Sequence, residues 1–308
     1  MHVCRRWRQI IFDSPRHLDI GILCTDKTPV SKNLNIIWPH LPIAIDCYFP
    51  RELMEPEDGD DIIAALEDPD RVCYLRLRWR LPDLWLEKVS TMMQKPFPAL
   101  RSLTIHAVTL NRYAPFLSAD FLGGSVPRLQ EISLLFISFP ALPTLLSSTR
   151  DIVTLDLQKI PPSGYISPGA MVECLAMLPR LKTFVLGFQS ATFHPDQMDP
   201  PPITRSVLPA LTVFDFSGSS QYLEALVVRV NGPQLSQIAV VHWDQVGDTG
   251  LLRRSRFIHR SGGPRSILFR HAQVNFYRNN VTFCLYSHAN HPSSEPCPGT
   301  FISYDRND

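Results

Sequence analysis

Apolar residues recur along this chain in triplets that occupy positions 1, 4 and 6 of a short frame. Successive frames begin 23 to 30 residues apart. In an extended segment the side chains at positions 4 and 6 point to one side and the side chain at position 5 to the other, so each frame predicts a β-strand with one buried face. The eight triplets are Val72/Leu75/Leu77, Leu100/Leu103/Ile105, Leu129/Ile132/Leu134, Ile152/Leu155/Leu157, Leu181/Phe184/Leu186, Leu211/Phe214/Phe216, Leu235/Ile238/Val240 and a weaker Pro264/Ile267/Phe269.

Helix-like stretches lie between the predicted strands. The clearest covers residues 167–179, in which Ser167 can cap the first turn, Pro168 suits the first helical position and Pro179 ends the helix. The other helix-like stretches are residues 60–68, 82–93, 114–123, 219–230 and 250–260.

A single strand followed by a single helix cannot bury its apolar face alone, whereas stacked copies bury that face against one another. The pattern therefore predicts an α/β fold, a solenoid with a parallel sheet on one side and helices on the other. A wound α/β sheet is the alternative, because it also alternates strands and helices. The lack of a glycine-rich first turn and the 28 prolines of the chain disfavour that alternative.

The two ends of the chain depart from the repeat. Residues 273–286 predict a β-hairpin around Asn279 and Asn280, which would cover the open edge of the last repeat. Near the other end, residues 41–49 predict a first strand, and an acidic loop at 49–61 leads into a helix.

Composition and charge are those of a globular protein without a global electrostatic preference. Apolar residues make up 44% and charged residues 19% of the chain, and 30 basic residues oppose 29 acidic ones. No field therefore steers the chain onto nucleic acid or an anionic membrane. The most apolar segment, residues 134–146, is too short to span a bilayer and contains two prolines. We expect neither a nucleic-acid nor a membrane partner.

The seven cysteines are scattered and form no CxxC pair. An odd, sparse set is typical of reduced thiols in the cytoplasm or nucleus rather than of a disulfide scaffold.

Sequence motifs of known active sites are absent. The chain contains no GxSxG, GxxxxGK[ST], HExxH or GxGxxG motif, so we expect no catalytic residue, no cofactor and no enzyme activity. Cys284, His288, His291 and Cys297 lack the two tight pairs of a structural zinc site, so no metal is expected there. Asp156 and Asp215 stand at position 5 of different strands, about 10 Å apart with a strand between them, too far to act as an acid–base pair.

Positions 3 and 5 of each frame project from the other sheet face, which is the predicted binding surface. Its charge changes from basic near the N-terminus to acidic in the middle, which favours a protein partner of mixed charge. The candidate target-binding residues are Tyr74, Arg76, Glu131, Asp156, Asp215 and Gln237.

The first residues add a family resemblance. In "VCRRWRQIIFDSPRHLDI", Val3, Trp7, Ile10 and Ile11 share one helix face, and Ser14-Pro15-Arg16 forms the exit. The segment resembles the last helix of an F-box, and the order of this helix, a spacer and irregular leucine-rich repeats is similar to that of fungal F-box proteins. The repeats depart from the leucine-rich consensus at position 9, where the family usually has Asn or Cys. The residues found there are Arg80, Val108, Ile137, Ile160, Gln189, Ser219 and Trp243.

The resemblance implies an irregular leucine-rich-repeat solenoid whose repeats present a target, and an F-box helix that faces the Skp-type adaptor of a cullin ubiquitin ligase. A free-standing repeat protein, or a truncated gene product without a ligase role, is the alternative. The expected organisation has four parts. They are the remnant of the last F-box helix and its exit at 1–20, an irregular spacer with the first strand and a helix at 21–71, the repeats and terminal hairpin at 72–286, and a disordered tail at 287–308.

Overall fold

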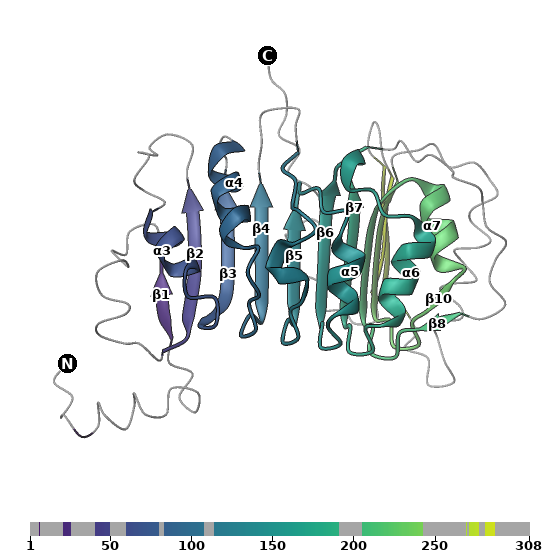
Figure 1. The fold of residues 1–308 in the computed structure, drawn as a ribbon. Helices are drawn as coiled ribbons and strands as arrows, with labels where there is room; N and C mark the ends of the chain where they lie inside the picture. The colour runs from purple at the N-terminus through teal and green to yellow at the C-terminus, as the bar shows by residue number, and fades with distance from the viewer. Residues whose placement is uncertain are drawn as a thin grey trace, which may run out of the picture. The chain divides into compact units, whose positions relative to one another are not determined.

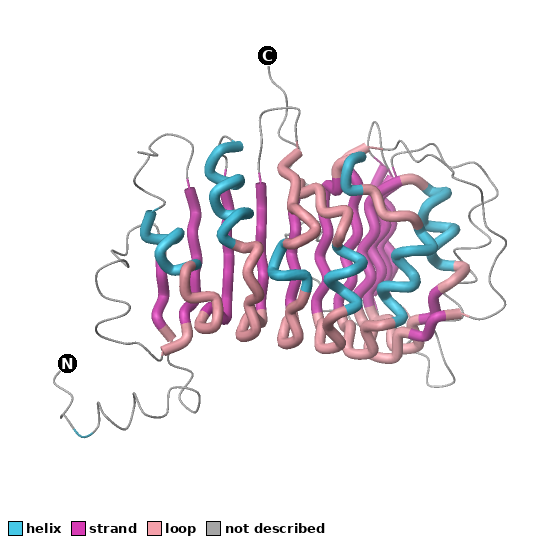
Figure 2. The backbone as a smooth tube through the Cα atoms, in the orientation of Figure 1, coloured by secondary structure: helices cyan, strands magenta, loops and turns pink. Residues whose placement is uncertain are grey.

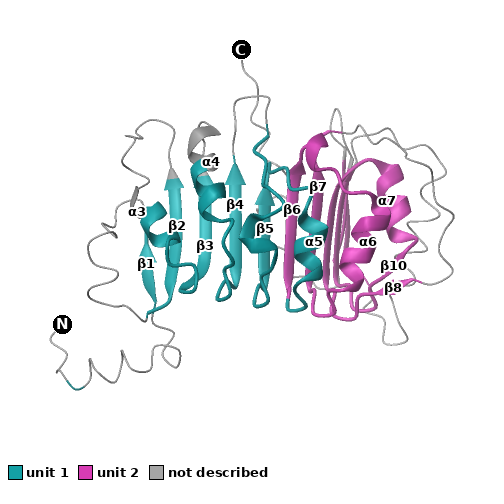
Figure 3. Ribbon diagram, viewed as in Figure 1, with its two compact units in different colours: residues 1–151 teal, residues 152–308 magenta. Residues whose placement is uncertain are grey.

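The computed structural model describes residues 6, 21–25, 41–49, 60–79, 83–107, 114–190, 205–242, 269, 271–276 and 281–286. The chain divides into two compact units, residues 1–151 and 152–308 (Figure 3). The predicted adaptor-facing residues Val3, Trp7, Ile10 and Ile11 lie outside the described residues, as do the helix predicted at 250–260 and the tail at 287–308.

The protein is α/β, with eleven strands in open, mostly parallel β-sheet. In unit 1 the strands follow chain order and every described pair is parallel (Figure 1). These strands are β1 (Ile22–Cys24), β2 (Ile43–Phe49), β3 (Val72–Trp79), β4 (Ser102–Ala107) and β5 (Glu131–Leu135). The strand predicted at 41–49 is confirmed, but it is the second strand, because the short β1 pairs with it from within the predicted spacer.

In unit 2 the hydrogen-bonded order is β6-β7-β9-β11-β13-β12. The first four strands are parallel, and β13 and β12 are added antiparallel. The predicted hairpin is thus confirmed, with β13 covering the edge of β11. The strands are β6 (Thr154–Ile160), β7 (Thr183–Phe188), β9 (Val213–Gly218), β11 (Gln237–His242), β12 (His271–Phe276) and β13 (Val281–Tyr286), with a separate parallel pair of β8 (Ser206–Val207) and β10 (Val230–Asn231).

Four of the predicted helices are confirmed. Unit 1 contains α3 (Asp60–Leu66) and α4 (Asp83–Met92), and unit 2 contains α6 (Pro168–Ala176) and α7 (Ser220–Val227). The Ser167 hydroxyl accepts a hydrogen bond from the amide of Ala170 at 3.2 Å and so caps α6 as expected. Within each unit the helices lie on one side of the strands (Figure 2).

One predicted helix is wrong, and one helix was not predicted. Residues 114–123 form no α-helix: Phe116 makes a parallel bridge with Ser138, and the chain then enters the 3-10 turn η1 (Phe121–Gly124). Pro115 disfavours helical backbone before it, and Gly123 and Gly124 adopt left-handed backbone with φ of 62° and 68°. The unpredicted helix is α5 (Leu142–Ser147), which begins within the apolar segment at 134–146. A second 3-10 turn, η2 (Pro162–Gly164), precedes α6.

The repeat frame describes the core. In the first seven frames every residue at positions 1, 4 and 6 is at most 6% exposed. The frames are in register across each unit, as when Leu75 lies opposite Leu103 and Leu103 opposite Ile132. The predicted buried face is therefore confirmed. The eighth frame lies outside the described residues except for Phe269, which belongs to no strand.

Consecutive repeats are joined by main-chain hydrogen bonds at position 2. The amide of Arg101 donates to the carbonyl of Cys73, and the amide of Gln130 donates to that of Arg101, both at 2.8 Å. Unit 2 repeats this ladder from Val153 through Lys182, Thr212 and Ser236. A main-chain ladder connects the repeats without the asparagine side chains of the leucine-rich consensus.

In five of the repeats, a β-turn that contains a proline comes directly before the ladder residue at position 2. The amide at position 1 donates to the carbonyl three residues earlier, as Leu100 does to Phe97, and a proline follows that carbonyl. Proline is favoured at the second residue of such a β-turn because its φ is already set. The five turns of this kind are 97–100, 126–129, 178–181, 208–211 and 232–235.

Candidate interaction face

The candidate site is the sheet face formed by positions 3, 5 and 7 of β3 to β5 and by the residues of β1 and β2 in register with them, and we call it the unit-1 face. Strand register arranges its side chains in three rows that run across the strands. The first row is Leu23, Ala44, Tyr74, Ser102 and Glu131, the second is Asp46, Arg76, Thr104 and Ser133, and the third is Tyr48, Arg78, His106 and Leu135.

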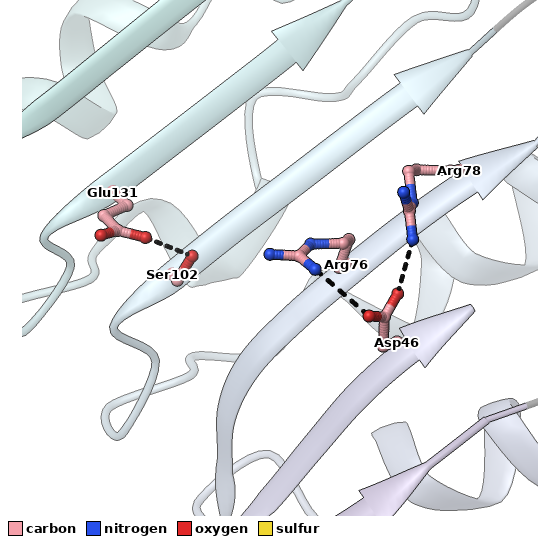
Figure 4. A network of polar contacts seen from close by, with 5 residues as sticks. All are labelled: Asp46, Arg76, Arg78, Ser102 and Glu131. Atoms are coloured by element: carbon pink, nitrogen blue, oxygen red, sulfur yellow. Dashed lines mark hydrogen bonds and ion pairs between the residues drawn. The ribbon is translucent and has the colours of Figure 1, made fainter. Parts of the chain in front are cut away.

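Two arginines of β3 share one carboxylate of β2. Arg76 Nη1 lies 3.2 Å from Asp46 Oδ2, and Arg78 Nη2 lies 3.3 Å from Asp46 Oδ1 (Figure 4). All three side chains are a third or more exposed, so solvent screens these pairs and each stabilises the fold by about 0–1 kcal/mol. The arrangement orients the guanidinium groups more than it stabilises the sheet.

Large aromatic side chains stand beside these arginines. Tyr48 is 56% exposed and Tyr74 is 44% exposed, and the guanidinium carbon of Arg78 lies 5.6 Å from the centre of the Tyr48 ring. Stacking of this kind fixes both groups without burying them. Exposed Tyr and Arg side chains are the residue types that most often anchor protein–protein interfaces.

The far side of the unit-1 face carries a separate acidic group. Glu131 of β5 accepts a hydrogen bond from the Ser102 hydroxyl at 3.0 Å (Figure 4). In the rows above it, His106 Nε2 and the Ser133 hydroxyl are 2.9 Å apart. The face is therefore polar on β4 and β5, and basic and aromatic on β2 and β3.

On β9, β11 and β13 of unit 2 the same face carries buried residues. Asp215 is 6% exposed, Ala239 is 1% exposed and Cys284 is fully buried, although all three stand on the side opposite the helix-facing core. The expectation that Asp215 projects into solvent is therefore wrong. Asp156 and Gln237, also predicted for the binding face, are half-buried.

Burial changes the chemistry of Asp215. The pKa of its carboxyl is raised from 3.8 to about 7: loss of solvent is the larger cause, the nearby negative charge of Asp156 adds to it, and the hydrogen bond from the main-chain amide of Phe216 opposes it. Val185 of β7 lies in register between Asp156 and Asp215, as predicted, and Gln158 Nε2 donates to Asp156 at 2.9 Å. The two carboxyls are too far apart to share a proton directly, so the pair does not have the geometry of an acid–base dyad.

The structure thus separates the six predicted residues. Tyr74, Arg76 and Glu131 lie together on the unit-1 face, whereas the other three belong to unit 2. Seven residues of the face lie outside the predicted set, because β1 and β2 belong to the predicted irregular spacer and positions 3 and 5 do not include position 7. They are Leu23, Ala44, Asp46, Tyr48, Arg78, His106 and Leu135. The alternation in Ile43–Phe49 was the available signal, because Asp46 and Tyr48 oppose buried Ile45 and Cys47.

No group of three or more His, Cys, Asp or Glu side chains among the described residues could hold a metal ion. None of the helices that the structure describes has the length and apolar character needed to cross a bilayer.

Comparison with known proteins gives no identification: no protein-family model matches the chain, and no curated protein matches it significantly in sequence.

Proposed function

We propose that this protein is a non-catalytic interaction scaffold that binds a protein target on the unit-1 face. The observation that carries the proposal is the continuous surface of β2 to β5, where exposed Tyr48, Tyr74 and Arg76 and half-buried Arg78 stand on a parallel sheet. Preformed surfaces of this kind bind with little loss of conformational entropy, because the strands already hold the anchors in place.

We further propose that the repeats form an irregular solenoid of the leucine-rich type. The registered positions 1, 4 and 6, the main-chain ladder at position 2 and the recurring proline turn support this architecture. Such repeats bury their cores only against their neighbours and leave a broad sheet surface for a partner.

The function that fits these features is substrate recognition in a Skp–cullin–F-box ubiquitin ligase, in the cytoplasm or nucleus. Its support is the likeness of Val3, Trp7, Ile10 and Ile11 to the last F-box helix, followed along the chain by the repeats. In this function the helix predicted around Trp7 faces the adaptor, and the unit-1 face holds the target.

Adaptor binding is tested with purified Skp-type adaptor and the full chain in size-exclusion chromatography. We expect co-elution, and we expect loss of co-elution for Trp7→Ala together with Ile11→Asp. Arg128→Glu, an exposed substitution in a turn of unit 1, serves as the control. No co-elution of the unaltered chain would remove the ligase role and leave the free-standing binding protein.

Target binding is tested by placing a photo-crosslinking phenylalanine analogue at Tyr74 or, as a matched control, at Met177. The two side chains are similarly exposed, 44% and 40%, but Met177 follows helix α6. We expect one protein to crosslink from position 74 and not from position 177, and to lose the crosslink in Arg76→Glu. Equal crosslinking from both positions would contradict a target site on the unit-1 face.

A further inference from the structure

On β2 and β3, the described side chains of the unit-1 face carry more positive than negative charge. Arg76 and Arg78 carry two positive charges, and among the residues that the structure describes the carboxylate that contacts both is that of Asp46. One positive charge therefore remains at β2 and β3 without a partner among the described side chains. In addition, Arg78 Nε has no hydrogen-bond partner within the described part of the chain.

An opposite imbalance exists at the other side of the face. Among the interactions described for Glu131, its carboxylate receives one hydrogen bond, from the neutral hydroxyl of Ser102. A hydroxyl donor does not neutralise a carboxylate, so Glu131 keeps its negative charge at an exposed position. The unit-1 face thus has a positive pole at Arg76 and Arg78 and a negative pole at Glu131.

The separation of the poles matches the spacing of residues in an extended chain. Arg76 and Glu131 stand two strands apart, about 10 Å across the sheet, and Glu131 is offset by two residues, about 7 Å along the strands. The direct separation of their main chains is therefore about 12 Å. An extended peptide covers this distance in three to four residues at about 3.3 Å each.

We propose that the unit-1 face binds an extended segment of a partner protein that carries one acidic and one basic side chain three to four residues apart. The acidic side chain lies against Arg76 and Arg78, and the basic side chain lies against Glu131. This inference rests on the proposed function and defines the class of target. A polyanion fits the same surface poorly, because Glu131 and Asp46 repel it.

The test uses the full chain and short fluorescent peptides of serine, threonine and valine. The peptides differ from one another at two positions only, which have three residues between them. One peptide carries Asp and Lys there, one carries two Asp, one carries two Lys and one is neutral. Fluorescence anisotropy at low salt should show the Asp–Lys peptide binding about fivefold to tenfold more tightly than the other three, since both poles are then matched.

Charge reversal in the protein should change the preference in a defined way. Glu131→Arg should favour the peptide with two Asp, and Arg76→Glu with Arg78→Glu should favour the peptide with two Lys. Lys88→Glu in α4 and Glu173→Arg in α6 change exposed charges of helices, which lie on the other side of the strands, and should leave the ranking unchanged (Figure 2). Circular dichroism of each variant establishes that it is folded.

Several results would overturn the inference: no peptide binding, equal binding of all four peptides, or a ranking that charge reversal does not alter. Tighter binding of a heparin fragment than of the Asp–Lys peptide would overturn it in favour of a polyanion. The crosslinking experiment at position 74 tests target binding independently, so it shows whether the charge pattern alone is wrong or the proposed function as well. A target crosslinked there without any charge preference leaves the scaffold function and removes only the charge pattern.

Discussion

The two units are built from the same frame, yet they use the second side of their sheet in opposite ways. In unit 1 position 5 of β3 holds the exposed Arg76, whereas in unit 2 position 5 of β9 and β11 holds the buried Asp215 and Ala239. The helix-facing cores are equivalent, with apolar residues at positions 1, 4 and 6 throughout. The repeat therefore determines one face of the sheet and leaves the other face free to serve as a surface or as a second buried layer.

The largest expected effect comes from placing the same arginine at position 5 in both units. Ala239→Arg should destabilise the fold by at least ~4 kcal/mol, because a bulky cation is forced into a buried site. Thr104→Arg, in the second row of the unit-1 face, should change stability by less than ~1 kcal/mol. Urea unfolding of the two variants measures the difference, and equal destabilisation would contradict the contrast between the faces.

A smaller effect is expected from the pH dependence of Asp215. Its pKa is about 7 in the folded chain, against an ordinary 3.8, so folding favours the protonated form. The stability that this preference provides is complete below pH ~4 and is lost as the pH rises through 7. Relative to Asp215→Asn, the unaltered chain should lose roughly 3 kcal/mol between pH 5 and pH 8, at ~1.4 kcal/mol per pKa unit.

The control for this measurement is Asp156→Asn, which removes the neighbouring charge but keeps the burial of Asp215. It should reduce the pH dependence only in part, because burial is the larger cause of the shift. Parallel stability curves for the unaltered chain and Asp215→Asn across this pH range would show that Asp215 is solvated.

The smallest effect is expected for the aspartate of the exposed face. Asp46→Asn breaks two ion pairs, but both are screened by solvent, so the stability cost should stay below ~1 kcal/mol and should fall further at high salt. Thermal unfolding at low and high salt measures it. A loss of several kcal/mol would mean that Asp46 belongs to a packed layer, as Asp215 does.

The sequence predicts those parts of the fold that depend on residues close together in the chain, such as single strands, helix starts and turns. The strict alternation at positions 4 and 6 located seven strands, and Ser167 with Pro168 located the start of α6. The proline turns were also present in the sequence, since Pro98, Pro127 and three equivalent prolines each stand two residues before position 1. Their fixed place in the frame is a local signal that the triplet of apolar positions does not include.

The remaining features depend on contacts between distant segments. Asp215 stands between two phenylalanines in the same alternation as exposed Arg76, so only tertiary burial distinguishes the two. Residues 114–123 are predicted as a helix, but the amide of Leu117 donates instead to the carbonyl of Ser138 at 2.9 Å. Asp46 and Arg76 are 30 residues apart, and the pairing of β2 with β3 brings them together.

The main-chain ladder at position 2 has a consequence for how this molecule tolerates change. The bond needs an amide and a carbonyl and no particular side chain, which is why cysteine, arginine, glutamine, lysine, threonine and serine all occur there. Proline alone is forbidden, since it lacks the amide hydrogen, although the same residue is favoured three positions earlier. Residues at position 2 can therefore be substituted by any amino acid except proline while the main-chain hydrogen bond between neighbouring repeats is kept.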